Sequence, residues 1–269
     1  MGSGIAQLTA QSGFYTILYE LNDTVLENAR LGIETILQRL VEKEKITVEE
    51  KVKTLQRLHF TNDIHSCLAD VFIEAIAEKQ EIKIAMFNQL AELNHSECIF
   101  ATNTSSLSVT KIAASVKNPE RVIGMHFFNP APVMKLVEIV NTTYTNDKTT
   151  QVMEELARQL GKTPVFCKDA PGFIVNRVAR PYYLESLRLA EKGVSDFSRI
   201  DTVLEATGFR MGPFRLMDLI GNDVNYAVSV SVHDQLGRPE RLQPSFIQKE
   251  KVEAGELGKK TGKGYYQYK

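Results

Sequence analysis

The strongest constraint on the fold is an alternation of short apolar runs with helical segments through the first 169 residues. The apolar runs, which we interpret as buried strands, are 14–19, 71–76, 98–102, 121–125, 136–140 and 164–166. Helical periodicity lies between several of them, most clearly at 79–93 and 149–160. Strands that alternate with helices predict an α/β unit with a doubly wound, mainly parallel sheet. Such sheets bind ligands at the carboxyl ends of their strands.

One stretch inside this unit departs from the alternation. Residues 22–58 predict a helical hairpin, in which Asn22 or Asp23 caps a long helix and a second helix covers roughly 48–58. The lysines and arginines of the hairpin are typical of a solvated face, although they could also meet a ligand that carries phosphate.

A cluster of turn residues, Asp169-Ala170-Pro171-Gly172, ends the alternation. The helical patterns beyond it are 173–192, 200–207 and 218–233. We therefore expect an α/β domain at 1–169 and an all-helical domain at 170–269. The glycine-rich, basic end from Gly258 to Tyr266 is typical of a frayed terminus.

Composition argues against several classes of protein. A net charge of −1 gives no support for binding nucleic acid or a membrane surface. No apolar run approaches the roughly 18 residues of a membrane span. Three isolated cysteines predict free thiols in a reducing compartment, and hence a cytoplasmic protein. Five histidines without ligand spacing predict no metal site.

The first strand ends in a candidate cofactor residue, Glu20, which follows Gly2 by 18 positions. In Rossmann-like units a glycine loop opens a helix that holds pyrophosphate, and an acidic residue about 20 positions later binds the ribose diol. Gly2 then matches the third glycine of that loop. The carboxylate would repel a 2′-phosphate, which favours NAD over NADP. An ordinary glutamate at a strand end explains Glu20 equally well.

The strand and the two glycines that should precede Gly2 are absent from the sequence. We expect two unpaired strand edges, next to the runs at 14–19 and 71–76, and weak or absent binding of NAD. A start assigned at an internal methionine, or a truncation, explains this better than a genuine short form, because a sheet without its central strand should fold poorly.

His126 and Glu138 form a candidate acid–base pair, and His126 directly follows the run at 121–125. Pro130 and Pro132 then force a turn, and the run at 136–140 brings Glu138 back toward the imidazole. A carboxylate that binds one ring nitrogen fixes the tautomer and leaves the other nitrogen as a base. Taken alone, the same residues fit a structural histidine and an exposed glutamate.

Together the motifs resemble the L-3-hydroxyacyl-CoA dehydrogenase family, which includes short-chain 3-hydroxybutyryl-CoA dehydrogenases. The matching segments are 1–7, 103–107, 126–130, 135–138, 171–177, 211–214 and 259–266. They occur in register over nearly the whole chain, so the resemblance is specific. It implies reversible, NAD-dependent oxidation of a 3-hydroxyacyl-CoA, a role in fatty acid β-oxidation and lipid metabolism, and a homodimer formed through the helical domain.

The resemblance also assigns roles to residues. His126 would take the proton of the 3-hydroxyl as hydride leaves C3, and Glu138 would orient the imidazole. Ser105 and Asn176 would hydrogen-bond the reacting oxygen and the thioester carbonyl, which completes the site when the domains close. The expected cofactor pocket comprises Gly2, Glu20, Glu78, Lys83, Asn103, Ser105, Asn129 and Lys260.

Binding of CoA is expected to use Lys43, together with Ser105 and Asn176. Relatives can carry a hydroxyl earlier in the same predicted helix, where this chain has Ile36. Two other functions remain open. One is a dehydrogenase of a non-CoA hydroxy acid or sugar acid, which Lys43 and the hairpin oppose. The other is a non-enzymatic structural protein like the lens crystallins of this superfamily, which the incomplete glycine loop favours and the complete catalytic set opposes.

Overall fold

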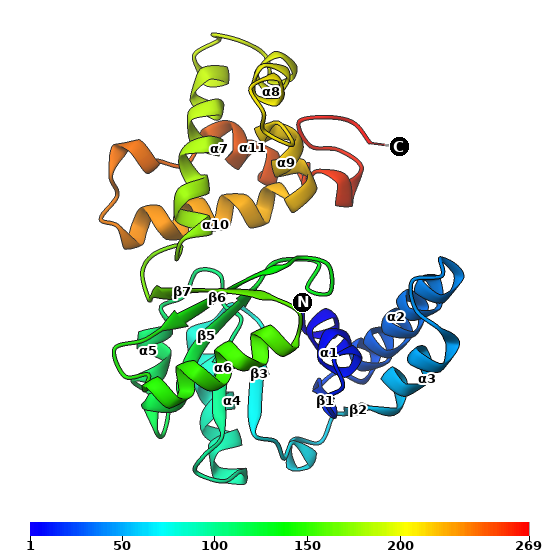
Figure 1. The fold of residues 1–269 in the computed structure, drawn as a ribbon. Coiled ribbons are helices and arrows are strands. Elements are labelled where there is room, and N and C mark those ends of the chain that lie inside the picture. The colour runs from blue at the N-terminus through cyan, green and yellow to red at the C-terminus, as the bar shows by residue number, and fades with distance from the viewer. Residues whose placement is uncertain (269) are drawn as a thin grey trace. The chain divides into compact units, whose positions relative to one another are not determined.

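The computed structural model describes residues 1–268 and consists of two compact units, Met1–Asp169 and Ala170–Lys269 (Figure 1). The first unit combines helices with sheet and the second is helical, which confirms the predicted fold class. None of the helices within residues 1–268 combines the length and apolar character that a membrane span requires. The three cysteines form no disulfide.

A five-stranded sheet forms the centre of the first unit. Its strands, in spatial order, are β3 (Val71–Glu74), β4 (Ile99–Thr102), β5 (Val122–Phe127), β6 (Leu136–Asn141) and β7 (Thr163–Lys168). Only the β5–β6 pair is antiparallel. The connecting helices are α4 (Gln80–Leu93), α5 (Val109–Ala113) and α6 (Asp147–Gln159). The polar residues that follow β3 and β4 therefore share one edge of the sheet with the end of β5.

The remaining two strands form a separate parallel sheet, β1 (Thr16–Tyr19) with β2 (Leu58–Thr61). Within residues 1–268, β1 pairs only with β2 and β3 only with β4, so the two expected unpaired edges are present. Helix α1 (Gly2–Gln11) contributes Ile5 and Leu8 to the core of the five-stranded sheet.

Strand β2 was not predicted, because residue 58 was assigned to the end of a helix. The strand is only four residues long, and although Leu58-His59-Phe60-Thr61 alternates apolar and polar residues, so short an alternation at the end of a helical pattern is a weak strand signal. The short 3-10 segments Ile64–Ser66 and Pro119–Arg121 lie in later connections.

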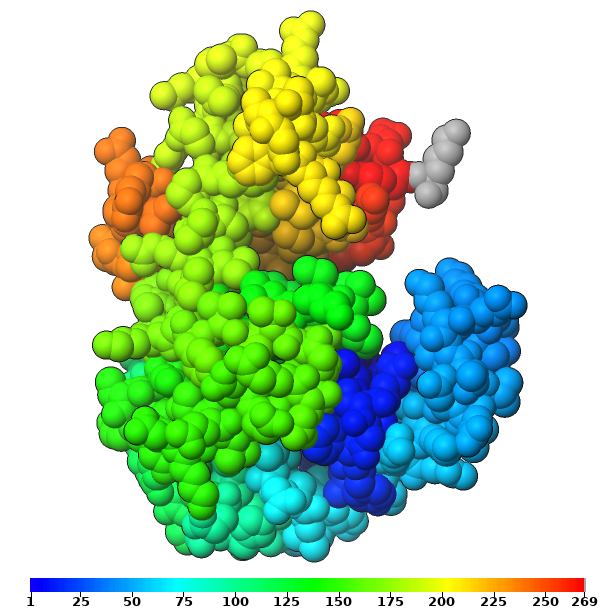
Figure 2. Space-filling view, in the orientation of Figure 1, coloured from blue at the N-terminus to red at the C-terminus, as the bar shows by residue number. Residues whose placement is uncertain are grey.

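The predicted helical hairpin is present as α2 (Asp23–Glu42) and α3 (Val48–Gln56). The Asn22 side chain accepts from the Val25 amide, and Thr47 and Glu50 form a reciprocal capping box at the start of α3. The hairpin stands out from the first unit as a separate lobe (Figures 1 and 2). Most of its surface is thus available to solvent or to a ligand.

The second unit is a set of helices around a core that includes Phe214 and Met217. These helices are α7 (Val175–Glu191), α8 (Phe197–Ala206), α9 (Pro213–Ile220), α10 (Asn222–Gln235) and α11 (Phe246–Glu253), with 3-10 segments at Glu240–Leu242 and Lys259–Thr261. The single helix expected at 218–233 is wrong. Gly221 has a φ of 106°, a left-handed conformation that separates α9 from α10.

The segment expected to be frayed, from Gly258 to Tyr266, is anchored. Asp218, which is 1% exposed, accepts hydrogen bonds from the Tyr265 and Tyr266 amides at 2.9 and 3.0 Å. The Tyr268 hydroxyl donates to the same carboxylate at 2.9 Å. A Cβ atom at Gly264 would overlap this carboxylate, so the approach requires glycine there.

Candidate active site

The antiparallel register of β5 and β6 places His126 directly opposite Glu138. Glu138 Oε2 lies 2.7 Å from His126 Nδ1, and the two side chains are 0% and 7% exposed. The contact expected from the proline turn is therefore present. His126 does not follow the strand, as the sequence indicated, because β5 continues through Phe127. The Phe128 ring packs against the imidazole, with 4.7 Å between ring centroids.

A buried lysine that sequence reasoning missed holds the turn between these strands. Lys162 Nζ donates to the carbonyl oxygens of Ala131 and Met134 at 2.6 and 2.9 Å. Burial, and secondarily the charge of Lys135, lowers the pKa of the Lys162 ammonium. Its contacts fix the loop between β5 and β6, although nothing local in the sequence links residue 162 to that loop.

Asn103 joins the ends of β4 and β5. Its side-chain oxygen accepts from the Phe127 amide at 2.8 Å, next to His126. Asn103 and His126 therefore lie together at the carboxyl ends of β4 and β5.

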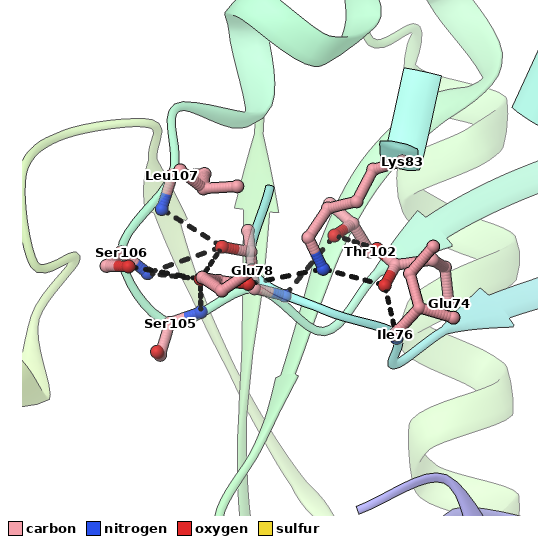
Figure 3. A network of polar contacts seen from close by, with 9 residues as sticks. Glu74, Ile76, Glu78, Lys83, Thr102, Ser105, Ser106 and Leu107 are labelled. Carbon is pink, nitrogen blue, oxygen red and sulfur yellow. Dashed lines mark hydrogen bonds and ion pairs between the residues drawn. The ribbon is translucent and has the colours of Figure 1, made fainter. Parts of the chain in front are cut away.

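Glu78 connects the segment after β3 to the loop after β4 (Figure 3). Its Oε1 atom accepts from the Ser105 amide at 3.1 Å, from the Ser106 amide and hydroxyl at 3.3 and 3.0 Å, and from the Thr104 hydroxyl. Burial by itself raises the pKa of the Glu78 carboxyl. The hydrogen bond from Thr104, the charge of Lys83 and the bond from Ser106 outweigh burial, so the pKa lies below its usual value.

Lys83 is buried, with a side chain that is 1% exposed. Its ammonium lies 2.7 Å from Glu74 Oε1 and 3.2 Å from Glu78 Oε2, so two carboxylates hold it. Sequence reasoning missed Glu74, the buried partner. A signal was available, because Glu74 interrupts the apolar run Val71–Ile76 as Glu138 interrupts the run at 136–140.

The residues expected to bind a dinucleotide have suitable neighbours. Glu20 follows β1, and its carboxylate accepts from the Asn22 amide at 3.1 Å. Helix α1 has neither a side-chain cap nor an acidic residue in its first turn, so no side chain competes there with an anion such as pyrophosphate. A Cβ at Gly4 would lie 3.4 Å from Pro132 Cδ, so α1 begins close to the β5–β6 loop. The Glu20 carboxylate and the uncapped start of α1 therefore suit the ribose and the pyrophosphate of NAD.

For four further predicted residues the structure shows only their local surroundings. Asn129 and Lys43 are exposed, and Lys43 is the residue at which α2 ends. In the second unit, Asn176 lies in the first turn of α7, and its carbonyl oxygen accepts from Arg180 at 3.1 Å. Lys260 forms an ion pair with Asp223, at 2.6 and 2.7 Å from the two carboxylate oxygens. Their roles toward ligands stay predictions.

A sheet with polar residues at its strand ends, a buried histidine–carboxylate pair and an acidic residue after β1 define the class of dinucleotide-dependent dehydrogenases. The model of the 3-hydroxyacyl-CoA dehydrogenase NAD binding domain matches residues 1–170, and that of the 3-hydroxyacyl-CoA dehydrogenase C-terminal domain matches 172–268. The chain therefore belongs to the 3-hydroxyacyl-CoA dehydrogenase family of oxidoreductases, and the expectation of NAD as cofactor is confirmed.

Relatives of known name agree with this assignment. The chain is 48% identical to the 3-hydroxyadipyl-CoA dehydrogenase of Escherichia coli K12, over all of this chain and 57% of that protein. It is 39% identical to the probable 3-hydroxybutyryl-CoA dehydrogenase of Deinococcus radiodurans, over 96% of that protein. The crystal structure of (S)-3-hydroxybutyryl-CoA dehydrogenase from Ralstonia eutropha superposes with a TM-score of 0.95 at 35% identity, covering all of this chain and 95% of that one.

Proposed function

We propose that this protein catalyses the reversible, NAD-dependent oxidation of an L-3-hydroxyacyl-CoA to the 3-ketoacyl-CoA. The observation that carries the proposal is the buried contact between His126 Nδ1 and Glu138 Oε2. An imidazole held at Nδ1 by a carboxylate has its tautomer fixed, so Nε2 is the atom that exchanges a proton with the substrate. The activities named for the relatives support an acyl-CoA substrate over a non-CoA acid or a structural role.

His126 takes the proton of the 3-hydroxyl group during oxidation, and the imidazolium returns it during reduction. Bound NAD supplies the acceptor for the hydride that leaves C3. Because Glu138 is fully buried, its charge acts on the imidazolium without competition from water. Ser105 and Asn176 donate to the substrate oxygens, where negative charge develops.

The remaining roles are also proposals. Glu20 binds the adenosine ribose, while Glu78, Asn103, Asn129 and Lys260 border the cofactor. Lys43, exposed at the end of α2, meets the phosphates of CoA. The protein acts in lipid metabolism in the cytoplasm, as a homodimer joined through the helical unit. Size-exclusion chromatography with light scattering tests the dimer, and a monomeric mass would contradict it.

The test of the activity is NADH oxidation with acetoacetyl-CoA, by the unaltered protein and by a His126→Gln variant. We expect turnover that the substitution abolishes. His95 provides a matched control, because it also contacts a carboxylate, Asp70, at 3.3 Å but lies on the surface. A His95→Gln variant should keep full activity, and equal loss in both variants would contradict the assignment of His126.

The substrate panel separates the remaining possibilities. Turnover of hydroxy acids without CoA would identify the alternative dehydrogenase, and folded protein that is silent with every substrate would favour the structural role. The assays use cofactor well above its dissociation constant, which is measured in parallel by NADH fluorescence. Weak binding of NAD stays a prediction, and a low dissociation constant would contradict it.

A further inference from the structure

The acidic residue Glu74, at the end of β3, has no role in the reaction described above. Its side chain is 1% exposed, and each of its oxygens is engaged. Oε1 accepts from the Ile76 amide at 2.6 Å and from Lys83 Nζ at 2.7 Å, and Oε2 accepts from the Thr102 hydroxyl at 2.7 Å. Glu74 therefore cannot reach a substrate or a cofactor. Whatever it does must act through its partners.

Those partners form a continuous path to the candidate active site (Figure 3). Glu74 holds the ammonium of Lys83, and Lys83 holds the second carboxylate, Glu78, at 3.2 Å. Glu78 is 38% exposed and is the end of the path that faces solvent. Its Oε1 atom accepts hydrogen bonds from the amides of Ser105 and Ser106, so the loop after β4 folds around one carboxylate oxygen.

This arrangement determines how Ser105 is presented. Because its amide donates to Glu78, its side chain is directed away from that carboxylate (Figure 3). The Thr104 hydroxyl donates to Glu78 as well and accepts from the Leu107 amide at 3.0 Å, so the loop is fixed on both sides of Ser105. A shift of Glu78 must therefore move Ser105.

The charges explain why Glu74 matters to that position. One buried ammonium lies between two carboxylates, so Lys83 is shared between Glu74 and Glu78. If Glu74 loses its charge, the attraction on Lys83 becomes one-sided and draws the ammonium toward Glu78. The stronger attraction between Lys83 and Glu78 would then compete with the hydrogen bonds that Glu78 accepts from the loop.

We propose that Glu74 is a positioning residue of the dehydrogenase, which sets the place of Ser105 through Lys83 and Glu78. The effect on turnover rests on the proposed function, whereas the effect on the loop does not. Glu74→Gln keeps the size of the side chain and removes its charge. Since a misplacement of about 1 Å at a reacting group costs roughly a hundredfold in rate, we expect kcat to fall about tenfold to a hundredfold. The KM for acyl-CoA should change less than about threefold, because Ser105 acts on the reacting oxygen.

A double-mutant cycle separates positioning through Ser105 from a general weakening of the fold. In a Ser105→Ala background, adding Glu74→Gln should lower kcat by less than about twofold. Thr102→Ser, which keeps the hydroxyl bond to Glu74, should retain the rate. Thr102→Val, which removes the bond, should lower it. Glu97→Gln is the matched control. Glu97 also pairs with a cation, Arg121, but the two residues lie at the amino ends of β4 and β5, opposite the loop that carries Ser105. It should leave kcat and KM unchanged.

Hydrogen exchange measured by mass spectrometry provides a readout that needs no turnover. We expect Glu74→Gln to speed exchange of the Ser105 and Ser106 amides at least about tenfold, while exchange in β5 and β6 stays as in the unaltered protein. The proposal would be overturned if the Glu74→Gln variant matched the Glu97→Gln control both in kcat and in the exchange of the Ser105 and Ser106 amides. Faster exchange throughout residues 1–169 would also overturn it, since that result means a purely structural role. If the unaltered protein has no activity, the proposed function fails and loop exchange alone decides the positioning role.

Discussion

Replacing Glu138 with glutamine tests whether the buried carboxylate supports catalysis by its charge. Glu138→Gln keeps the shape of the side chain and an oxygen that can face His126 Nδ1, now 2.7 Å from Oε2. In the proposed mechanism the imidazole becomes an imidazolium during oxidation, and the carboxylate stabilises that positive charge more strongly than the amide of glutamine does. The change therefore acts on the transition state more than on the free enzyme.

The size of the loss follows from the geometry. With charge centres about 4 Å apart and an effective dielectric constant of about 20, the attraction is about 4 kcal/mol, which is an upper bound because glutamine keeps a dipole. A charge-assisted hydrogen bond contributes about 1.5 to 3 kcal/mol. At about 1.4 kcal/mol per factor of ten, kcat should fall roughly 12-fold to 140-fold.

The assay is formation of NADH from L-3-hydroxybutyryl-CoA and NAD at saturating cofactor. The KM should change less than about threefold, since Glu138 is 0% exposed and cannot touch the substrate. Glu97→Gln serves as the control for loss of an ion-paired carboxylate, and circular dichroism shows whether each variant folds. A kcat within threefold of the unaltered protein, or a loss that appears only in KM, would refute the reasoning.

Three further predictions concern thiol reactivity, acid stability and packing. Burial, followed by the charges of Glu138 and Asp169, raises the pKa of the Cys167 thiol to about 12, so iodoacetamide at pH 8 should label it slowly and Glu138→Gln should speed labelling, as measured by mass spectrometry. The pKa of Glu78 is lowered in the folded protein, so its stabilisation is complete above the unfolded-state pKa and is lost as pH falls through the folded value. In Glu78→Gln the free energy of unfolding, measured by urea titration, should fall less on acidification than in the unaltered protein. An unchanged fall would contradict this prediction. Gly264→Ala should lower the melting temperature by several degrees, because its Cβ overlaps the Asp218 carboxylate, and an unchanged temperature would exclude that packing.

The sequence was most informative where local rules determine the structure. Two prolines between apolar runs required a turn, and the turn brought Glu138 to His126. The caps at Asn22 and Thr47 are hydrogen bonds between residues only three positions apart in the sequence. Local sequence therefore made the hairpin predictable. Short apolar runs likewise predicted all the strands of the five-stranded sheet.

Features that depend on distant residues were not predictable in this way. The pairing of Glu74 with Lys83 depends on how α4 packs against β3, and the run that contains Glu74 predicted only a strand. The anchored end of the chain depends on Asp218, which is 47 residues before Tyr265. The interrupted apolar run marks Glu74 but not its partner Lys83. Both pairings were missed because a buried charge finds its partner through tertiary packing, which a single sequence does not display.

The division of the strands into two sheets has a consequence for the cofactor. The segment that carries β1, β2 and the hairpin shares no hydrogen-bond ladder with the five-stranded sheet, and α1 ties it to that core through Ile5 and Leu8. Such a segment can open at a lower free energy than the rest of the unit. Glu20 lies in this segment, so if it binds the dinucleotide as proposed, bound cofactor favours the closed form of the segment by mass action. Protease cleavage within residues 14–61 should slow as NAD is added, and would then report how much of the protein carries cofactor.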